Sequence, residues 1–232
     1  FDAAMRYGNP SLKKILYKTI EKGSKDITIM PMFPQYSTTT TLSIFEKIKD
    51  IVAKDKNFFK DVTINAVDSF HKNNLYIKAC ASKIKTEQVH LDKPQKLIFS
   101  FHGIPESYIG EDEPYQKECL CTAKLIAEEL NLKKNEYEVA FQSRFGKAEW
   151  IKPYLSSRLE ELPKEGIKEV HIFCPGFSSD CLETIDEIGR ESKEEFMEHG
   201  GEIFHFIPCL NSHNDFIKAL IDIQSSASIK LL

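Results

Sequence analysis

The sequence lacks any apolar run long enough to cross a membrane, and its first residues show no secretory signal pattern. It also lacks an excess of basic residues: 31 Lys and Arg stand against 35 Asp and Glu, for a net charge of −4. Because binding to nucleic-acid phosphates usually needs a basic face, we expect no nucleic-acid partner. The six cysteines are scattered, which favours reduced thiols and a cytoplasmic location over a disulfide framework.

Three motifs that are common in α/β enzymes are also missing. No G-x-G-x-x-G follows a strand pattern, and no G-x-x-x-x-G-K-[ST] phosphate loop occurs, which argues against the usual nucleotide-binding folds. The G-x-S-x-G turn of serine hydrolases is absent as well. The sequence opens on Phe1, in what reads as the middle of an element, so we expect it to be a fragment.

What the sequence does contain is an alternation of short apolar runs and longer amphipathic segments. Strand patterns cover 26–33, 61–67, 95–101, 137–143, 169–174 and 202–209, and helical periods cover 41–54, 72–86, 114–130, 150–162, 181–200 and 211–223. Such alternation predicts an α/β architecture with parallel sheets. The tail 224–232 is expected to be loose.

A charged linker that contains a proline, at 89–95, is the predicted domain boundary. We therefore assign residues 1–92 to a first α/β domain and residues 93–210 to a second. Residues 211–232 form a C-terminal helix and tail in this division.

His102 stands where a ligand site is expected in such a fold. An apolar strand pattern runs directly into it, and Gly103, Pro105 and an acidic loop follow. In open parallel sheets, ligands bind beyond the carboxyl ends of the strands. A lone histidine at this place is more simply explained as hydrogen-bonded at a strand end, so the interpretation depends on what lies opposite.

An acidic helix follows the next such strand end. Glu183, Glu187 and Glu191 are spaced four apart, which stacks three carboxylates on one helix face. A solvated acidic face is the common explanation for this pattern. Like charges at that spacing are mildly destabilising, however, and the helix begins near the edge that carries His102. An imidazole facing a row of carboxylates suits the handling of a divalent metal and protons.

Aromatic residues gather in the loops at this same edge. Each alone is more typical of core packing, but together they could line an apolar cleft for a flat ligand. They are Phe33 and Tyr36 after the first strand, Phe145 and Trp150 with Gly146 between them, and Phe177 before the acidic helix.

The segment FSFHGIPESYIGEDEPY (99–115) closely resembles the signature of the ferrochelatases, which insert Fe²⁺ into a porphyrin. Further segments match in the same order: AMRYGNP (4–10), MFPQYSTTTT (32–41), FQSRFGKAEW (141–150), PGFSSDCLETIDEI (175–188) and PCLNSHNDF (208–216). The resemblance, closest to bacterial members, covers nearly the whole chain. It implies two Rossmann-like, chelatase-type parallel-sheet domains. The first would be incomplete, because the family's opening segment is missing, and the C-terminal helix would pack back on it.

The resemblance also implies roles for individual residues. His102 and Glu183 match the family's catalytic, metal-binding pair. Glu187 and Glu191 match an inner acidic row that relays metal or protons, and Asp180 matches a supporting carboxylate. The implied porphyrin-binding residues are Arg6, Tyr7, Phe33, Tyr36, Phe145, Gly146, Trp150 and Phe177.

The implied reaction is insertion of Fe²⁺ into protoporphyrin IX with release of two protons, the last step of haem synthesis, with coproporphyrin III as an open alternative substrate. Two other functions stay open: a cobalt or nickel chelatase for another tetrapyrrole, and a non-catalytic tetrapyrrole-binding module. The sequence does not decide which of His102 and Glu183 accepts protons and which delivers metal.

No resident cofactor is expected beyond the substrate metal. Some family members hold a 2Fe–2S cluster through one cysteine within the segment that matches 32–41 and three near the C-terminus. Thr38 occupies the first of these positions here and no cysteine follows Cys209, so we expect no cluster. We expect a monomer, and peripheral membrane contact stays open because the product is apolar.

Overall fold

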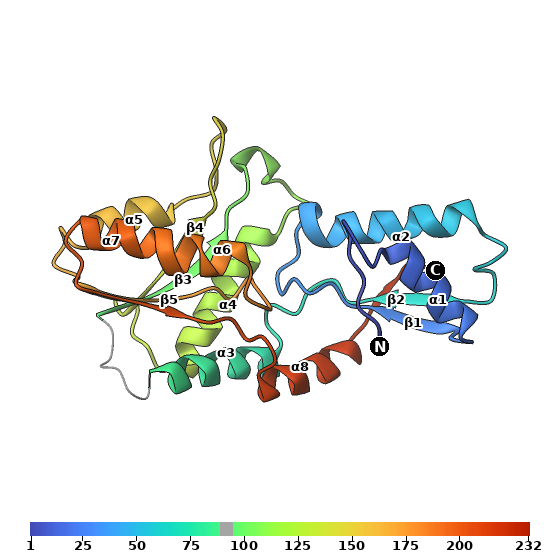
Figure 1. Ribbon diagram of the computed structural model, residues 1–232. Coiled ribbons are helices and arrows are strands. Elements are labelled where there is room, and N and C mark those ends of the chain that lie inside the picture. The colour runs from blue at the N-terminus through green and yellow to red at the C-terminus, as the bar shows by residue number, and fades with distance from the viewer. Residues whose placement is uncertain (89–94) are drawn as a thin grey trace.

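The computed structural model describes residues 1–88 and 95–232, which form two α/β lobes side by side (Figure 1). Among these residues, the first lobe holds a three-stranded sheet of order β1-β2-β7, and the second a four-stranded sheet of order β4-β3-β5-β6. Strands β1 and β2 are parallel to each other, and so are all four strands of the second sheet. The predicted α/β architecture with parallel sheets is therefore confirmed.

The elements follow the predicted alternation, with shifted ends. The strands are β1 Asp26–Ile29, β2 Thr63–Ala66, β3 Lys96–His102, β4 Tyr137–Gln142, β5 Glu169–Phe173, β6 Ile203–Ile207 and β7 Ile229–Lys230. The helices are α1 Leu12–Glu21, α2 Ser43–Lys54, α3 Asn74–Glu87, α4 Tyr115–Glu129, α5 Leu155–Glu161, α6 Leu182–Ile185, α7 Lys193–Glu198 and α8 Asn214–Gln224. Two π-helical turns, Thr38–Leu42 and Glu187–Ser192, lead into α2 and join α6 to α7.

The second lobe is a sheet with helices on both faces, as parallel strands require. Helices α5, α6 and α7 lie over one face, and α3 and α8 over the other (Figure 1). Successive side chains of β5 point to opposite faces of the sheet and pack in different hydrophobic clusters. Val170 and Ile172 join the hydrophobic cluster that contains Leu159 of α5 and Phe196 of α7, whereas Phe173 joins the cluster beneath α3, α4 and α8. The sheet is thus buried from both sides.

The first lobe has a single hydrophobic cluster. Helix α2 contributes Phe45 and Ile48, which pack with Ile64 of β2 and with Phe59. Strand β7 pairs antiparallel with β2, and Leu231 packs against the same cluster. The expectation that the tail 224–232 is loose was wrong, because β7 belongs to the sheet.

Helix α8 returns the chain toward the first lobe. It packs against α3 in the core of the second lobe, and β7, not α8, is the part of the C-terminal segment that enters the first sheet. Helix α3 lies within the range 1–92, yet its buried Ile77 and Ile84 pack in the same cluster as Phe99 of β3. The core of the second lobe therefore includes residues from before the linker, and the exact domain limits stay a prediction.

Three local differences from the sequence reading have physical causes. The predicted helix 181–200 is interrupted, because the π-helical turn separates α6 from α7. The helix expected over 150–162 begins at Leu155, since a residue before Pro153 is biased away from helical geometry. Helix α1, which was not predicted, is capped by the Ser11 side chain on the Lys14 N–H.

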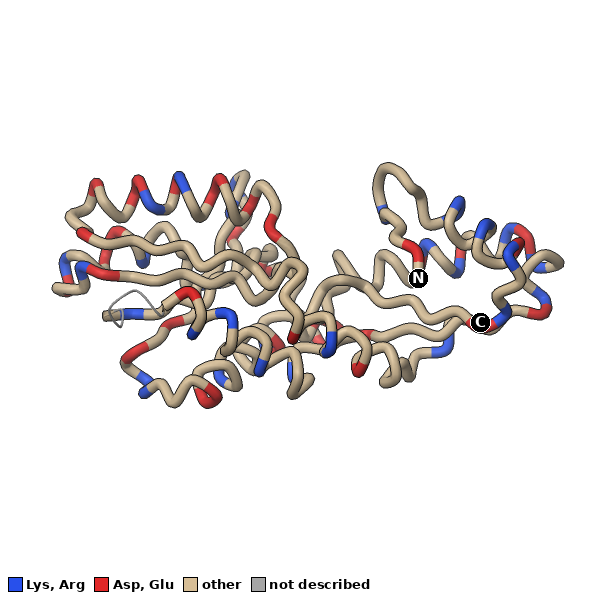
Figure 2. Tube along the Cα trace, turned by 60° about the horizontal axis from the view of Figure 1, so that its bottom comes forward, with Lys and Arg blue, Asp and Glu red and all other residues tan. Residues whose placement is uncertain are grey.

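Charged residues of both signs alternate along the trace of both lobes (Figure 2). None of the helices within the described residues combines the length and apolar character that a membrane-spanning helix needs.

Candidate active site

Strands β3 and β4 end side by side, and the loops that follow them project from the same edge of the sheet (Figure 1). These two loops are bonded to each other. The Ile151 N–H donates to the Ile104 carbonyl at 3.0 Å, and the Glu106 N–H donates to the Glu149 carbonyl at 2.9 Å. The two loops, 103–114 and 143–154, are therefore held together by backbone hydrogen bonds rather than being independent.

His102 is the last residue of β3, and its backbone and ring are both held. The Tyr115 hydroxyl donates to the His102 carbonyl at 2.8 Å, and His102 Nδ1 lies 2.6 Å from the Gly103 carbonyl oxygen. Because a carbonyl only accepts, Nδ1 carries a proton in this contact, and in the neutral ring Nε2 then has a free lone pair. A Cβ at Gly103 would lie 3.0 Å from the Gln142 carbonyl oxygen, so glycine lets the two strand ends approach without this tight contact.

Two predicted aromatic residues lie beside His102. The buried Trp150 has its ring centroid 6.3 Å from that of His102, and Phe145 lies 5.0 Å from Trp150. Phe145 itself is 73% exposed, although it is a large apolar side chain. Gly146 follows it with φ of 73°, a conformation that glycine adopts without strain. The structure therefore brings three of the predicted residues together at one apolar edge.

Glu183 lies at the start of α6, in the loop–helix segment after β5. The Cys181 thiol and the backbone N–H of Glu183 itself hydrogen-bond to its carboxylate and hold its pKa below the usual value, while burial opposes them. The nearby His102 also lowers this pKa, by less than the other causes do. The influence of His102 on Glu183 is thus weak, and the role of the two residues as a pair stays a prediction.

Glu187 accepts hydrogen bonds from the end of β4. The Ser143 N–H and the Ser143 hydroxyl each lie 2.6 Å from one of its two carboxylate oxygens. The Gln142 amide reaches the carboxylate at 3.5 Å. Glu187 is therefore bonded to the end of β4, whereas the carboxylate of Glu183 is bonded within its own segment.

Asp180 ties the start of α6 to the loop after β6. It accepts from the Asn211 side chain at 2.7 Å, from the Cys209 N–H at 3.0 Å and from the Thr184 hydroxyl at 3.2 Å. Burial would raise the pKa of Asp180, but these hydrogen bonds outweigh it and the pKa is lowered. Asp180 therefore holds the segment that carries Glu183 against the loop after β6.

Glu191 differs from the other two glutamates of the predicted row. It is exposed on the π-helical turn and pairs with Arg190 at 2.9 Å. Arg190 also pairs with Asp186 at 2.6 Å, so local charges are balanced at this end of the row.

The porphyrin-binding residues predicted in the first lobe have contacts of their own. Arg6 donates to the hydroxyl and carbonyl of Ser43, at 2.9 and 3.0 Å, and lies 4.4 Å from the Tyr7 ring centroid. Tyr7 and Phe33 are exposed, Tyr36 is half-buried, and Phe177 packs against a second-lobe cluster. No distance links Arg6 or Tyr7 to His102 among the described contacts, so their role stays a prediction.

Two carboxylates fasten the loop after β1 to the second lobe. Glu113 accepts from the Ser37 hydroxyl at 3.1 Å and from the Thr38 N–H at 2.8 Å. Glu118 accepts from the Tyr36 N–H and the Ser69 hydroxyl, both at 2.7 Å. The segment that carries Phe33 and Tyr36 is therefore anchored to α4 and to the loop before it.

Sequence reasoning missed Gln142, Ser143 and Cys181, which all touch the acidic residues of the site. The first two carried a signal, because polar residues that end a buried parallel strand lie at the ligand-binding edge. It missed Glu113 and Glu118 as well, and the partners that they hold before the linker lie 47 to 82 positions away, so no local pattern reveals them.

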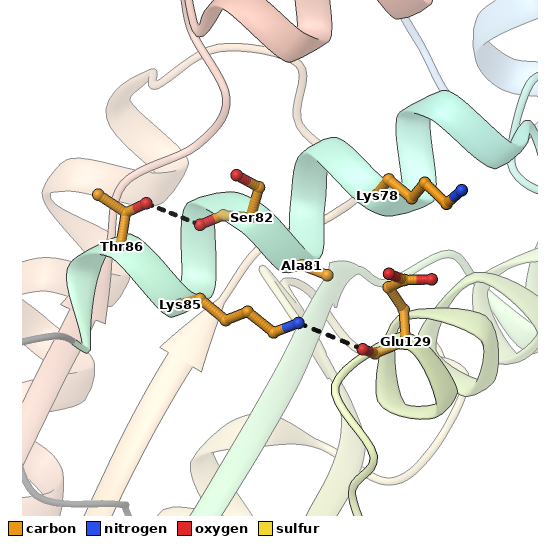
Figure 3. A pocket seen from close by; sticks show the side chains of 6 residues that line it. All are labelled: Lys78, Ala81, Ser82, Lys85, Thr86 and Glu129. Carbon is orange, nitrogen blue, oxygen red and sulfur yellow. Dashed lines mark hydrogen bonds between the residues drawn. The ribbon is translucent and has the colours of Figure 1, made fainter.

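Two shallow depressions lie away from this edge, on α3 and α4. One, of about 320 Å³, is lined by Lys78, Ala81, Ser82, Lys85, Thr86 and Glu129 (Figure 3). The other, of about 290 Å³, shares Glu129 with it. Neither includes a predicted site residue. Within residues 1–88 and 95–232, no three His, Cys, Asp or Glu side chains are arranged to hold a metal ion.

Solved structures with a similar fold are chelatases. The Bacillus subtilis protein SirB, solved with Fe³⁺, matches with a TM-score of 0.68 and 15% identity, over 98% of this chain and 82% of that chain. The sirohydrochlorin chelatase SirB from Bacillus subtilis subspecies spizizenii, in complex with cobalt, matches with a TM-score of 0.63 and 12% identity, over 97% and 82%. At these identities the likeness shows the fold, and it confirms the predicted chelatase type.

Sequence relatives are closer. The enzyme named Ferrochelatase from Idiomarina loihiensis is 43% identical over 222 residues, which are 94% of this chain and 59% of the relative. Its counterpart from Psychrobacter arcticus is 45% identical over 221 residues, with 94% and 64% covered. The chain thus spans 59% to 64% of the length of these curated relatives. A family model described as Ferrochelatase matches residues 1–228, and the chain belongs to the ferrochelatase family.

Proposed function

We propose that this chain carries the metal-inserting site of a ferrochelatase, which places Fe²⁺ in a porphyrin and releases two protons. The observation that supports this most is the position of His102 at a strand end beside the buried Trp150, which in turn contacts the exposed Phe145. Glu183 lies near enough for His102 to lower its pKa slightly. A base, a metal-binding carboxylate and an apolar wall are the three things that the reaction needs. Family membership supports the same reaction.

His102 is the proton acceptor in this mechanism. A free-base porphyrin carries two N–H protons that must leave before a metal can bind all four pyrrole nitrogens. The free lone pair of Nε2 can accept such a proton, because Nδ1 is already engaged with the Gly103 carbonyl. Histidine is the side chain that most often transfers protons in this way.

Glu183 receives and releases the metal. Its pKa is lowered by the Cys181 thiol, by its own N–H and by His102, so it is anionic at neutral pH. Carboxylate oxygens bind a hard divalent cation without holding it as tightly as thiolates would hold a softer one. Glu183 is exposed, so a hydrated ion can reach it from solvent. The apolar residues press on the ring face, and binding energy from the ring's remote parts drives its distortion.

The finer features belong to the same proposal. The substrate is protoporphyrin IX, the protein is a cytoplasmic monomer, and no resident cofactor or 2Fe–2S cluster takes part. The exposed Phe145 and Leu182 at the site are suited to receiving an apolar ring and to brief contact with a membrane surface.

The test is metal insertion by the longest open reading frame that contains this chain. We expect zinc or iron insertion into protoporphyrin IX, followed by absorbance, to fall at least about 100-fold in His102→Ala, because a positioned base contributes a factor of this order. His199→Ala is the matched control, since His199 lies on the exposed end of α7 and its ring hydrogen-bonds the Glu195 carbonyl of its own helix. Unchanged insertion in His102→Ala would remove His102 from the mechanism. Metal insertion into sirohydrochlorin but not into protoporphyrin IX would show that protoporphyrin IX is not the substrate.

A further inference from the structure

Ser143, the first residue after β4, has a backbone conformation that side-chain-bearing residues rarely adopt. Its φ is 66°, in the left-handed region. Such conformations persist where the surroundings demand them, and they gather at functional sites. The question is what this turn achieves that a glycine or a relaxed backbone would not.

The turn aims both hydrogen-bond donors of Ser143 at one carboxylate. Its N–H lies 2.6 Å from Glu187 Oε1, and its hydroxyl lies 2.6 Å from Glu187 Oε2. Both oxygens of Glu187 are therefore engaged by short hydrogen bonds from a single residue. A carboxylate held in this way cannot swing toward a metal without losing both bonds.

Gln142, the last residue of β4, holds the backbone of the same helix segment. Its side chain is buried, and its amide Nε2 donates to the Glu183 carbonyl oxygen at 2.7 Å. That carbonyl lies where α6 passes toward the π-helical turn 187–192, and such widened turns disturb the regular backbone bonding of a helix. The amide thus replaces part of the bonding that the irregular helix gives up.

The same Gln142 side chain is fixed to the strand that carries His102. Its Oε1 accepts from the Ser100 hydroxyl at 2.8 Å, and Ser100 lies in β3, two positions before His102. Because side chains two apart in a strand share a face, Ser100 and His102 lie on the same side of the sheet. A buried polar path therefore runs from the strand of His102 to the backbone of Glu183.

We propose that Gln142 and Ser143 form a positioning clamp, the 142–143 clamp, which sets the rotation of the segment 183–187 so that Glu183 faces His102. This inference rests on the proposed function. Glu187 is a positioning residue in this arrangement, a fixed acceptor for the clamp rather than a carrier that moves with metal or protons. Glu183, which is exposed and bonded by a thiol, is the mobile member.

The first experiment measures the clamp without reference to activity. Hydrogen exchange of the segment 183–192 is compared in wild type, Ser143→Ala and Ser143→Gly. We expect exchange there to be about tenfold faster in both variants, because each loses the hydroxyl donor while Gly also relieves the backbone strain. Asn131→Ala is the matched control: Asn131 is also left-handed, with φ of 56°, and lies after α4, away from the site.

The second experiment links the clamp to the reaction. It uses the polypeptide that the longest open reading frame containing this chain encodes. We expect Ser143→Ala and Ser143→Gly to raise the KM for Fe²⁺ about tenfold and to leave the Kd for protoporphyrin within twofold. A role in general folding would weaken porphyrin binding as well. Glu187→Gln should raise the KM for Fe²⁺ no further when it is added to Ser143→Ala, because both changes break the same contact.

The outcomes separate the two proposals. Unchanged exchange in 183–192 overturns the clamp, whatever the activity. Faster exchange with an unchanged KM for Fe²⁺ overturns its positioning role and makes Glu187 purely structural. A wild-type polypeptide that inserts no metal at all overturns the proposed function, and the exchange result then decides the clamp by itself.

Discussion

The two sheets of the molecule differ in how they are covered. Strand β3 of the second lobe has its residues 97–101 buried and has a paired neighbour on each side. Strand β1 of the first lobe has no fully buried residue and, among the described residues, one paired neighbour, β2. Parallel strands normally read as apolar runs buried on both faces, and only the second sheet meets that pattern.

The two lobes also contribute different residues to the candidate site. His102, Gln142, Ser143 and Glu183 all belong to the second lobe, where two hydrophobic clusters enclose the sheet. The first lobe adds Tyr36 and its neighbours through a loop that Glu113 and Glu118 bind to the second lobe. The residues of the proposed metal-inserting site thus lie on the second sheet or directly beside it, and our proposal gives the first lobe the role of a wall.

Removing a large core side chain from each lobe gives the largest expected effects. Phe99→Ala in β3 and Phe59→Ala in the first lobe each remove a fully buried ring and should each cost about 3–5 kcal/mol locally. We expect Phe99→Ala to lower protection from hydrogen exchange in both lobes, because the first lobe rests on the second. Phe59→Ala should lower it in α1, α2 and β2 alone. Loss of protection in β3 from Phe59→Ala would contradict the division.

Acid should weaken the second lobe through a buried histidine in the middle of β5. His171 in β5 is fully buried, and burial, helped by the nearby His205, lowers its pKa to about 4. Its Nε2 lies 3.5 Å from a Glu169 oxygen, and its Nδ1 lies 3.0 Å from the Gln88 amide. Because an unfolded histidine titrates near 6.5, the unfolded state binds the extra proton between pH 4 and 6.5.

The sign follows from that proton count. Stability rises with pH through this window, so acidification from pH 7 to 4 should remove roughly 3 kcal/mol through His171. Denaturant unfolding at several pH values measures the effect, and His171→Leu should flatten the slope between pH 6.5 and 4. An equal slope in wild type and His171→Leu would mean that the histidine is protonated as readily when folded as when unfolded.

The contact between the two lobes at Glu118 should respond to pH more weakly than His171 does. Burial would raise the pKa of Glu118, but hydrogen bonds from His71, the Tyr36 N–H and Ser69 outweigh it and lower the pKa. The stabilisation is present above the unfolded pKa near 4.5 and is lost as the pH falls through the folded value. We expect Glu118→Gln to cost about 1–3 kcal/mol at pH 7 and to speed exchange at Tyr36.

The control for this change lies on the same helix. Lys124 of α4 is exposed and pairs with Glu128 of its own helix, so Lys124→Ala should leave exchange at Tyr36 unchanged. If Glu118→Gln also left it unchanged, the carboxylate would not anchor the loop after β1.

The smallest effect is expected on the exposed end of the acidic row. Arg190 pairs with Asp186, Glu191 and Glu194 at the surface, and exposed ion pairs add little to stability. Arg190→Ala should leave the melting temperature and the exchange of β3 unchanged within error. A clear drop in melting temperature would show that the π-helical turn depends on this network.

Much of the fold could be predicted because its signals are local. Apolar period and strand alternation identified the strands and most helices, since burial on one or two faces dictates them. Helix α1 had such a signal, with Leu12, Ile15 and Leu16 on one face, and the sequence reading left it unassigned. Strand β7 had none, because a two-residue strand is defined only by pairing with the distant β2.

The site divides in the same way. His102 could be placed at a strand end from its apolar run, and its role came from the family resemblance. The contacts of Glu187 could not be predicted, because they depend on the left-handed turn at Ser143 and on the π-helical turn, and neither has a residue pattern of its own. The helical spacing suggested three equivalent carboxylates, and the structure gives Glu183, Glu187 and Glu191 three different environments.

The central claim is that His102 and Glu183 act as one unit, and a double-mutant cycle on metal insertion tests it most directly. The rates of His102→Ala, Glu183→Gln and the double variant are measured in the longer polypeptide with porphyrin saturating. The account predicts that the double variant is no slower than the slower single variant, because either change already disables the unit. Losses that multiply would mean that the two residues act independently, and the facing pair would not be the catalytic centre.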